Sequence, residues 1–170
     1  MTLPKVKRIL YTTSLGPHTR PVYRHALEQA RQHQAEVIML HVINPVGELG
    51  EALIKQYLPD ELVKKVHDEG VSRVLAQMKT RVQGFFEEEL SHLTVPVGVV
   101  VTPMVVDGLH DEAILRVAER EKVDLIVMGT EHKFGLHGHS QTTQQVIRRS
   151  RVPVLVVPTG REHSHSEPLV

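Results

Sequence analysis

The chain has 170 residues, a length that fits one ordinary domain. Hydrophobic residues make up 41% and charged residues 24%, a mixture that excludes an intrinsically disordered chain. The 20 basic and 20 acidic side chains balance, so the net charge does not indicate a nucleic-acid partner or an anionic lipid surface. Cysteine is absent, which excludes disulfides, thiolate zinc sites and cysteine nucleophiles.

The opening residues, MTLPKVKRILYTT, contain no long apolar run, so we expect no secretory signal. No stretch approaches the ~20 apolar residues that a helix needs to span a bilayer. We therefore expect a cytoplasmic protein without membrane insertion.

Five short runs rich in Val, Ile and Leu predict β-strands. They cover residues 8–13, 36–43, 97–101, 124–128 and 153–157. Several are apolar at every position rather than at every second one, which is typical of strands that are covered on both faces.

Four segments between the strands predict helices, because their apolar residues recur every three or four positions. These segments are residues 22–30, 59–93, 114–118 and 146–147. Strands that alternate with helices indicate an α/β fold, in which a doubly wound parallel sheet carries helices on both faces.

The predicted domain covers residues 1–158. The polar tail 159–170, rich in His and Ser, is expected to be disordered. The connection 44–58 contains proline and glycine and joins the second strand to the long helix.

In a sheet of this kind, ligands bind outside the carboxyl ends of the strands. The loop after the fourth strand, GTEHKFGLHGHSQTT, contains three glycines and several hydroxyls. Glycines let the backbone approach an anion, and the next helix offers free N–H groups. The alternative is an ordinary loop in which Ser140 caps that helix.

Four segments, KRILYTTS, EVIMLHVINP, DEAILRVAEREKVDLIVMGT and TTQQVIRRSRVPVLVVP, together resemble the universal stress protein (UspA-like) family. The resemblance covers residues 6–158. It implies a five-stranded parallel sheet in the order 3-2-1-4-5, the adenine nucleotide alpha hydrolase-like fold, and a role in stress response.

One branch of this family binds ATP through the motif Gly-x2-Gly-x9-Gly-Ser/Thr after the fourth strand, together with an aspartate after the first strand. Gly129 matches the first glycine, but His132 stands at the second. Ser140 and Gln141 stand at the third glycine and the hydroxyl, in a loop two residues shorter than the motif. Ser14 stands at the aspartate position. The resemblance therefore implies a degenerate nucleotide-binding motif.

The adenine side of the crevice keeps its apolar character at Val42 and Met128. The ligand positions implied by the resemblance are Thr12, Ser14, Val42, Met128, Gly129, His132, Ser140, Gln141 and Thr142.

Two functions remain open. The first is a stress-response module that acts through an unknown protein partner and needs no cofactor. The second is a sensor that binds ATP or AMP weakly in the crevice between the first and fourth strands. We expect no enzyme activity, since no GxSxG nucleophile motif is present. A weak ATPase is the only enzymatic alternative.

The last strand is an edge in the implied order, and an exposed apolar edge is a pairing hazard unless it is used. Family members pair this strand with its two-fold mate. The resemblance therefore implies a homodimer whose interface contains Pro153, Val154, Leu155, Val156 and Val157.

Twelve histidines are an unusually large number for this length. His132, His137 and His139 lie in the glycine-containing loop, where they would serve as metal ligands or as pH-sensitive phosphate contacts. No carboxylate accompanies them at metal-binding spacing and nothing resembles HExxH, so we expect no metal site.

Overall fold

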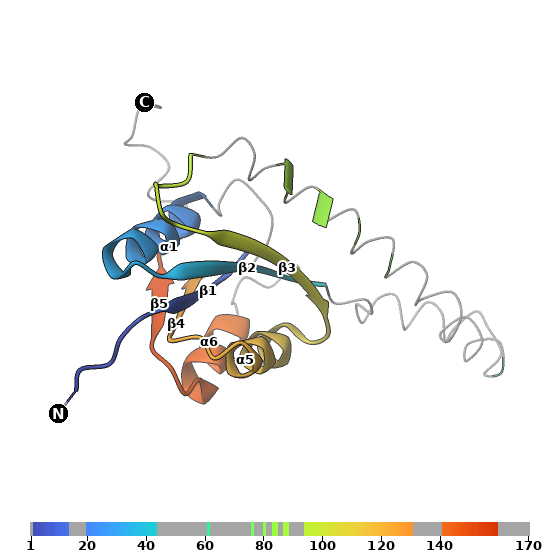
Figure 1. Ribbon diagram of the computed structural model, residues 1–170. Helices are drawn as coiled ribbons and strands as arrows, with labels where there is room; N and C mark the ends of the chain where they lie inside the picture. Colours follow the sequence, from blue (N-terminus) through green and yellow to red (C-terminus); the bar gives the residue numbers. More distant parts are fainter. Residues whose placement is uncertain are drawn as a thin grey trace.

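The computed structural model describes residues 2–13, 20–43, 94–130 and 141–159, and residues 61, 76, 80, 83, 84, 87 and 88 between them. Five parallel strands form one sheet in the order β3-β2-β1-β4-β5 (Figure 1). The strands are β1 (Arg8–Thr12), β2 (Glu36–Ile43), β3 (Val101–Asp107), β4 (Leu125–Gly129) and β5 (Val154–Val157). The helices with described bounds are α1 (Arg20–His33), α5 (His110–Arg120) and α6 (Gln141–Arg149).

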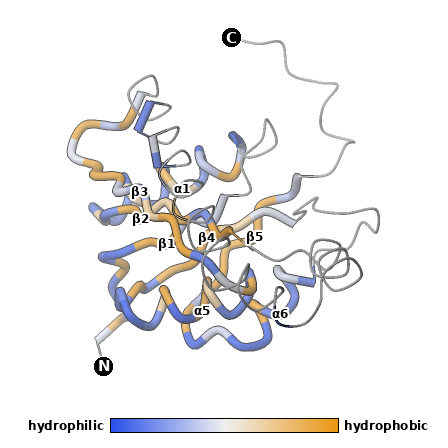
Figure 2. The backbone as a smooth tube through the Cα atoms, turned by 90° about the vertical axis from the view of Figure 1, so that its right-hand side faces the viewer, coloured by the Kyte–Doolittle hydropathy of each residue, from blue (hydrophilic) through white to orange (hydrophobic). Residues whose placement is uncertain are grey.

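The sheet separates two hydrophobic clusters, with α1 on one face and α5 and α6 on the other (Figure 1). Successive side chains of a strand point to opposite faces, so Ile9 and Tyr11 join the first cluster and Leu10 joins the second. Hydrophobic segments accordingly run through the middle of the molecule (Figure 2). This double covering explains why the strands have continuous apolar runs.

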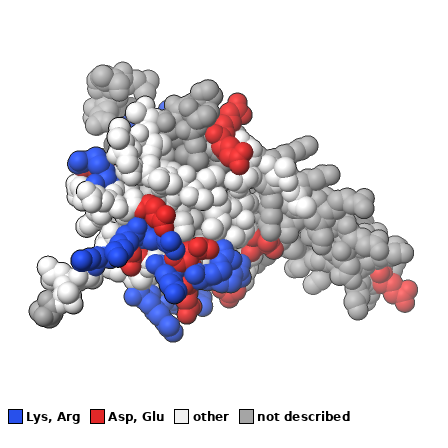
Figure 3. All heavy atoms as spheres, in the orientation of Figure 1, with Lys and Arg blue, Asp and Glu red and all other residues white. Residues whose placement is uncertain are grey.

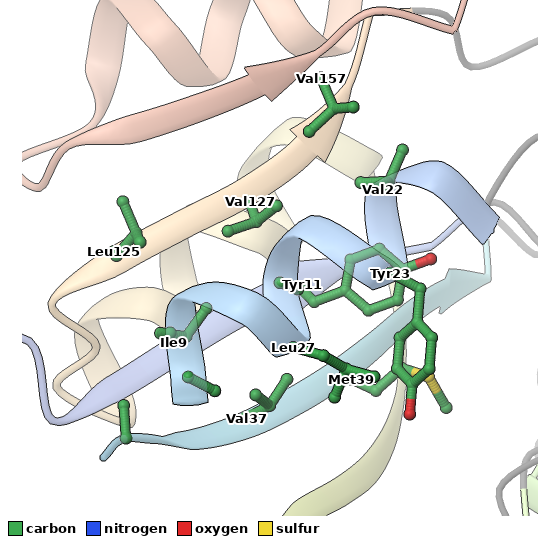
Figure 4. Packing of buried hydrophobic residues seen from close by; sticks show 13 residues of the cluster. Ile9, Tyr11, Val22, Tyr23, Leu27, Val37, Met39, Leu125, Val127 and Val157 are labelled. Atoms are coloured by element: carbon green, nitrogen blue, oxygen red, sulfur yellow. The ribbon is translucent and has the colours of Figure 1, made fainter. Parts of the chain in front are cut away.

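On the α1 face, the Tyr11 and Tyr23 rings lie 5.5 Å apart at 44° (Figure 4). Val22, Tyr23, Ala26, Leu27 and Ala30 are the buried residues of α1, as their helical spacing predicts.

The prediction for the third strand is wrong. The strand comprises Val101–Asp107 rather than residues 97–101. Residues 96–99 form a turn in which the Val99 N–H donates to the Pro96 carbonyl at 3.1 Å, and Gly98 adopts φ 86°. This left-handed conformation suits glycine and ends any strand there.

The other strands lie within one residue of their predicted bounds. The predicted helix 59–93 lies largely outside the described residues, although the described positions between 61 and 88 are helical. The connection 44–58, the loop 131–140 and the tail beyond Thr159 also lie outside them. Among the helices that are described, none is both long and apolar enough to cross a bilayer.

Polar contacts at the amino ends of the strands fix the position of β1. Asp124 Oδ2 accepts hydrogen bonds from the N–H groups of Lys7 and Arg8, at 2.9 and 3.1 Å. The Arg8 side chain forms an ion pair with Glu36 and donates to the Glu121 carbonyl at 2.6 Å. These contacts hold β1 between β2 and β4, so that the carboxyl ends of the three strands lie together at the opposite end of the sheet.

Candidate functional site

Thr12 lies at the carboxyl end of β1, paired in register with Leu40 of β2. Its side chain is 4% exposed, and its Oγ1 has no hydrogen-bond partner among the described residues. A buried hydroxyl without a partner costs about 1–3 kcal/mol. Within the described residues, the end of β1 therefore offers a hydroxyl whose hydrogen bond is not made.

Gly129 ends β4 in close contact with two other parts of the chain. A Cβ atom at this position would lie 3.0 Å from Thr159 Cγ2 and 3.2 Å from Val22 Cγ2. Nearly all real Cβ contacts are longer than this, so a side chain would not fit without displacing its neighbours. Close packing of α1 and of the chain after β5 therefore accounts for this glycine without any ligand.

Hydrogen bonds hold the same region together. Thr143 Oγ1, in the first turn of α6, donates to the Gly129 carbonyl at 3.0 Å. The Thr130 N–H donates to the Val157 carbonyl, and the Thr159 N–H donates to Thr130 Oγ1, both at 3.0 Å. The end of β4 is therefore tied both to α6 and to the segment that follows β5.

Val42 and Met128, the apolar positions assigned to the adenine side, are 5% and 0% exposed. Both belong to the cluster that packs the sheet against α5 and α6. Core packing is therefore sufficient to explain why they are apolar.

The remaining predicted positions are only partly described. At the start of α6, Gln141 is exposed and Thr142 is half-buried. Ser14, His132 and Ser140 lie outside the described residues. The structure brings Thr12, Gly129 and the first turn of α6 to one end of the sheet.

The sequence analysis assigned no role to His41, which is 8% exposed near the end of β2. Its Nδ1 lies 2.9 Å from the Thr13 carbonyl. A carbonyl only accepts, so Nδ1 carries the proton and donates. In the sequence, His41 stands out only as a polar residue within the apolar run EVIMLHVI.

Burial lowers the pKa of His41, and the nearby His110 lowers it further, against the opposing hydrogen bond to Thr13. Burial also lowers the pKa of His110, which begins α5. The carboxyl end of β2 and the start of α5 therefore favour neutral imidazoles.

Residues 5–158 match the family model described as the universal stress protein family. The chain belongs to this family. The match covers all the described strands and the three helices with described bounds. It confirms the resemblance inferred from the four sequence segments.

Two curated relatives come from Methanocaldococcus jannaschii. Universal stress protein MJ0577 is 29% identical over 157 residues, covering 89% of this chain and 94% of the relative. Universal stress protein MJ0531 is 26% identical over 153 residues, covering 89% and 81%.

Solved structures of universal stress proteins share the fold. The structure of MJ0577 has a TM-score of 0.61 and 30% identity, covering 90% of this chain and 96% of that one. UspA from Lactobacillus plantarum has a TM-score of 0.58 and 20% identity, covering 90% and 98%. The predicted five-stranded sheet in the order 3-2-1-4-5, adenine nucleotide alpha hydrolase-like, is therefore confirmed.

The two edge strands of this universal stress protein differ in their capacity to pair. The Gly108 N–H donates to the Ile43 carbonyl of β2, so alternate residues of β3, including Pro103, direct their backbone outward. Proline supplies no N–H there. The outward carbonyl of Asp107 accepts a hydrogen bond from Arg116 Nη2 at 3.1 Å. The β3 edge is therefore obstructed at two points.

Among the described residues, nothing obstructs the β5 edge in this way. The carbonyls of Pro153 and Val157 accept hydrogen bonds from the N–H groups of Ile126 and Thr130, and therefore face β4. By alternation, Val154 and Val156 direct their N–H and carbonyl groups outward. Their side chains and that of Leu155 are half-buried. In the part of the chain that the structure describes, β5 therefore presents outward backbone groups of the kind that pair with a further strand.

Within the described residues of this universal stress protein, no three His, Asp or Glu side chains lie close enough together to hold a metal ion. The loop histidines His132, His137 and His139 are outside that part of the chain. The expectation about metal remains a prediction.

Proposed function

We propose that this universal stress protein is a small, dimeric, cytoplasmic stress-response module with a degenerate nucleotide site, which acts through protein partners. In this proposal it needs no cofactor and is not an enzyme. The observation that carries the proposal is the packing around Gly129. The only motif glycine that this sequence retains lies against Thr159 and Val22, so its retention does not indicate a bound phosphate.

The other motif positions support the same conclusion. Ser14 provides a neutral hydroxyl where an ATP-binding member provides an aspartate. A hydrogen bond to a charged group is worth about 1.5–3 kcal/mol, against about 1 kcal/mol for a neutral one. Side chains at His132 and Ser140 hinder the close approach of backbone N–H groups that glycine allows. Since each ~1.4 kcal/mol is tenfold in affinity, these losses together move a micromolar site toward millimolar.

The edge strands support the dimer. The half-buried apolar side chains of β5 and its outward backbone groups would be covered by the same strand of a second copy. At the other edge strand, β3, Pro103 and the Arg116–Asp107 contact disfavour pairing. We therefore place the homodimer interface at residues 153–157.

The adenine-nucleotide sensor is the second candidate. The buried Thr12 Oγ1, without a partner among the described residues, favours it, because a ligand would supply the missing hydrogen bond. One universal stress protein solved in complex with cAMP shares the fold, with a TM-score of 0.52 and 20% identity. With a nucleotide bound, slow ATP hydrolysis is the activity to measure.

Native mass spectrometry of the purified protein tests both parts of the proposal. We expect twice the mass of the chain, with no additional mass from a nucleotide. A dimer that carries the mass of ATP or AMP would support the sensor instead. A monomer would contradict the proposed interface.

A further inference from the structure

A cleft of about 320 Å³ lies at the amino ends of β4 and β5, opposite the candidate nucleotide site. It lies between the last turns of α5 and the connection from α6 to β5. Its apolar lining includes Leu115 and Val152. Three basic side chains, Lys122, Arg149 and Arg151, surround it together with one acidic side chain, Glu119.

The lining carries three positive charges and one negative charge. Asp111, the ion-pair partner of Arg149, adds a second negative charge beside it, so the net charge is +1 in a chain that is neutral as a whole. Arg151 lies 3.8 Å from Glu119, but these side chains are 90% and 78% exposed, so the pair is weak. Arg149 contacts Asp111 at 3.3 Å. Lys122 has no ion pair among the described residues.

Charged side chains of both signs gather over α5 and α6, whereas much of the remaining described surface in this view carries none (Figure 3). The cleft combines an apolar surface with an excess of one positive charge, since Arg149 and Arg151 have ion-pair partners and Lys122 has none among the described residues. This combination limits the kind of ligand that fits.

A small anion would gain little here. Its contacts would be with exposed cations on two segments of the chain, and exposed ion pairs add little to affinity. Burial of apolar area also favours binding, so a ligand that covers Leu115 and Val152 as well binds more tightly. An extended ligand with alternating carboxylates and apolar side chains meets both requirements.

We infer that this cleft is the docking site for an acidic segment of a partner protein that carries apolar side chains between its carboxylates. The inference deepens the proposed function and rests on it, because it names the surface through which a protein partner would act. Charge complementarity and the apolar lining together select this partner.

Fluorescence anisotropy with a short fluorescein-labelled peptide that alternates glutamate and leucine tests the inference on the full chain. We expect saturable binding that weakens as salt is added. The double variant Lys122→Glu with Arg151→Glu reverses two exposed charges and should lower the affinity at least ~10-fold. The variant Leu115→Ser, whose unchanged fold is checked by circular dichroism because Leu115 also packs against the core, should lower the affinity without a change in charge.

The control variant, Lys5→Glu with Arg24→Glu, changes the net charge equally but alters exposed residues outside the cleft. It should bind the peptide as the wild type does. Equal loss in the control, equal binding of a peptide with lysine in place of glutamate, or displacement by millimolar inorganic phosphate would overturn the inference. Tighter binding of a single-stranded RNA than of the acidic peptide would also overturn it.

The mass of each variant in solution separates the two proposals. If the wild type is a nucleotide-free dimer that does not bind the peptide, the docking inference alone fails. If a monomeric or nucleotide-loaded wild type binds the peptide and the double variant does not, the proposed function fails and the cleft remains a docking site.

Discussion

Gly129 shows how a residue of a ligand motif can be retained for packing. The sequence aligns it with the first glycine of the ATP motif, yet its neighbours are Val22, from the start of α1, and Thr159, which is 30 residues further along the chain. Neither contact can be read from local spacing, because both depend on how the sheet brings distant segments together.

The variant Gly129→Ala should destabilise the protein by about 1–3 kcal/mol, because a Cβ atom would force Thr159 and Val22 to move. Urea denaturation measures the free energy of unfolding. Adding Thr159→Ser removes the methyl group 3.0 Å from that Cβ position, so the double variant should lose less stability than the sum of the two single variants. An unchanged stability in Gly129→Ala would show that this space is open.

The role of His41 could not be predicted from the sequence for a similar reason. Its hydrogen bond to the Thr13 carbonyl depends on the register between β1 and β2, which the sequence does not reveal. Thr12, in contrast, was identified by resemblance, and the structure adds that its hydroxyl is buried.

Burial and the nearby His110 lower the pKa of His41 in the folded state. The unfolded chain then binds more protons than the folded chain, so stability rises with pH and falls as pH drops through and below ~6.5. We expect the urea midpoint to fall between about pH 7.5 and about pH 5.5. The variant His41→Asn keeps a donor near the Thr13 carbonyl without the titration, so its midpoint should fall less.

The exposed His25 provides the matched control, since His25→Asn should show the same fall as the wild type. His110→Asn should also reduce the fall, because burial lowers the pKa of His110 too. If His41→Asn and the wild type respond identically to pH, His41 does not contribute to acid sensitivity.

At the scale of elements, strands covered on both faces were predicted to within one residue, because their composition is set by two hydrophobic clusters. The third strand was misplaced because residues 97–106 are apolar almost throughout, so composition does not locate the turn. The turn at Gly98 separates residues 94–97 from the strand. Pro103 is tolerated inside β3 because its nitrogen points away from β2, the neighbouring strand.

The same principle provides a test of the β5 interface. The variant Val156→Pro removes an outward N–H group without breaking a β4–β5 hydrogen bond, as Pro103 does in β3. We expect it to shift the dimer toward monomer in light scattering. The matched variant Val105→Pro removes an outward N–H group from β3 and should leave the mass unchanged. A Val156→Pro protein that remains fully dimeric would place the interface elsewhere.

At the scale of the whole molecule, the two ends of the sheet have different properties. The carboxyl ends carry the residues that align with the family's nucleotide site. Of these, Val42 and Met128 pack in the core, and Gly129 packs against Val22 and Thr159. The amino ends carry the Asp124 contacts that position β1 and the basic cleft beside Lys122. The family resemblance identified the first end, whereas only the three-dimensional arrangement reveals the second.

Isothermal titration calorimetry of the wild-type protein with Mg-ATP at about pH 8, where histidines are largely neutral, tests the degenerate nucleotide site most directly. We expect no saturable heat at micromolar ATP, with any dissociation constant near the millimolar range, because the charged and glycine contacts of the motif are missing. A dissociation constant at or below the micromolar range would contradict the account and would identify the protein as a nucleotide sensor.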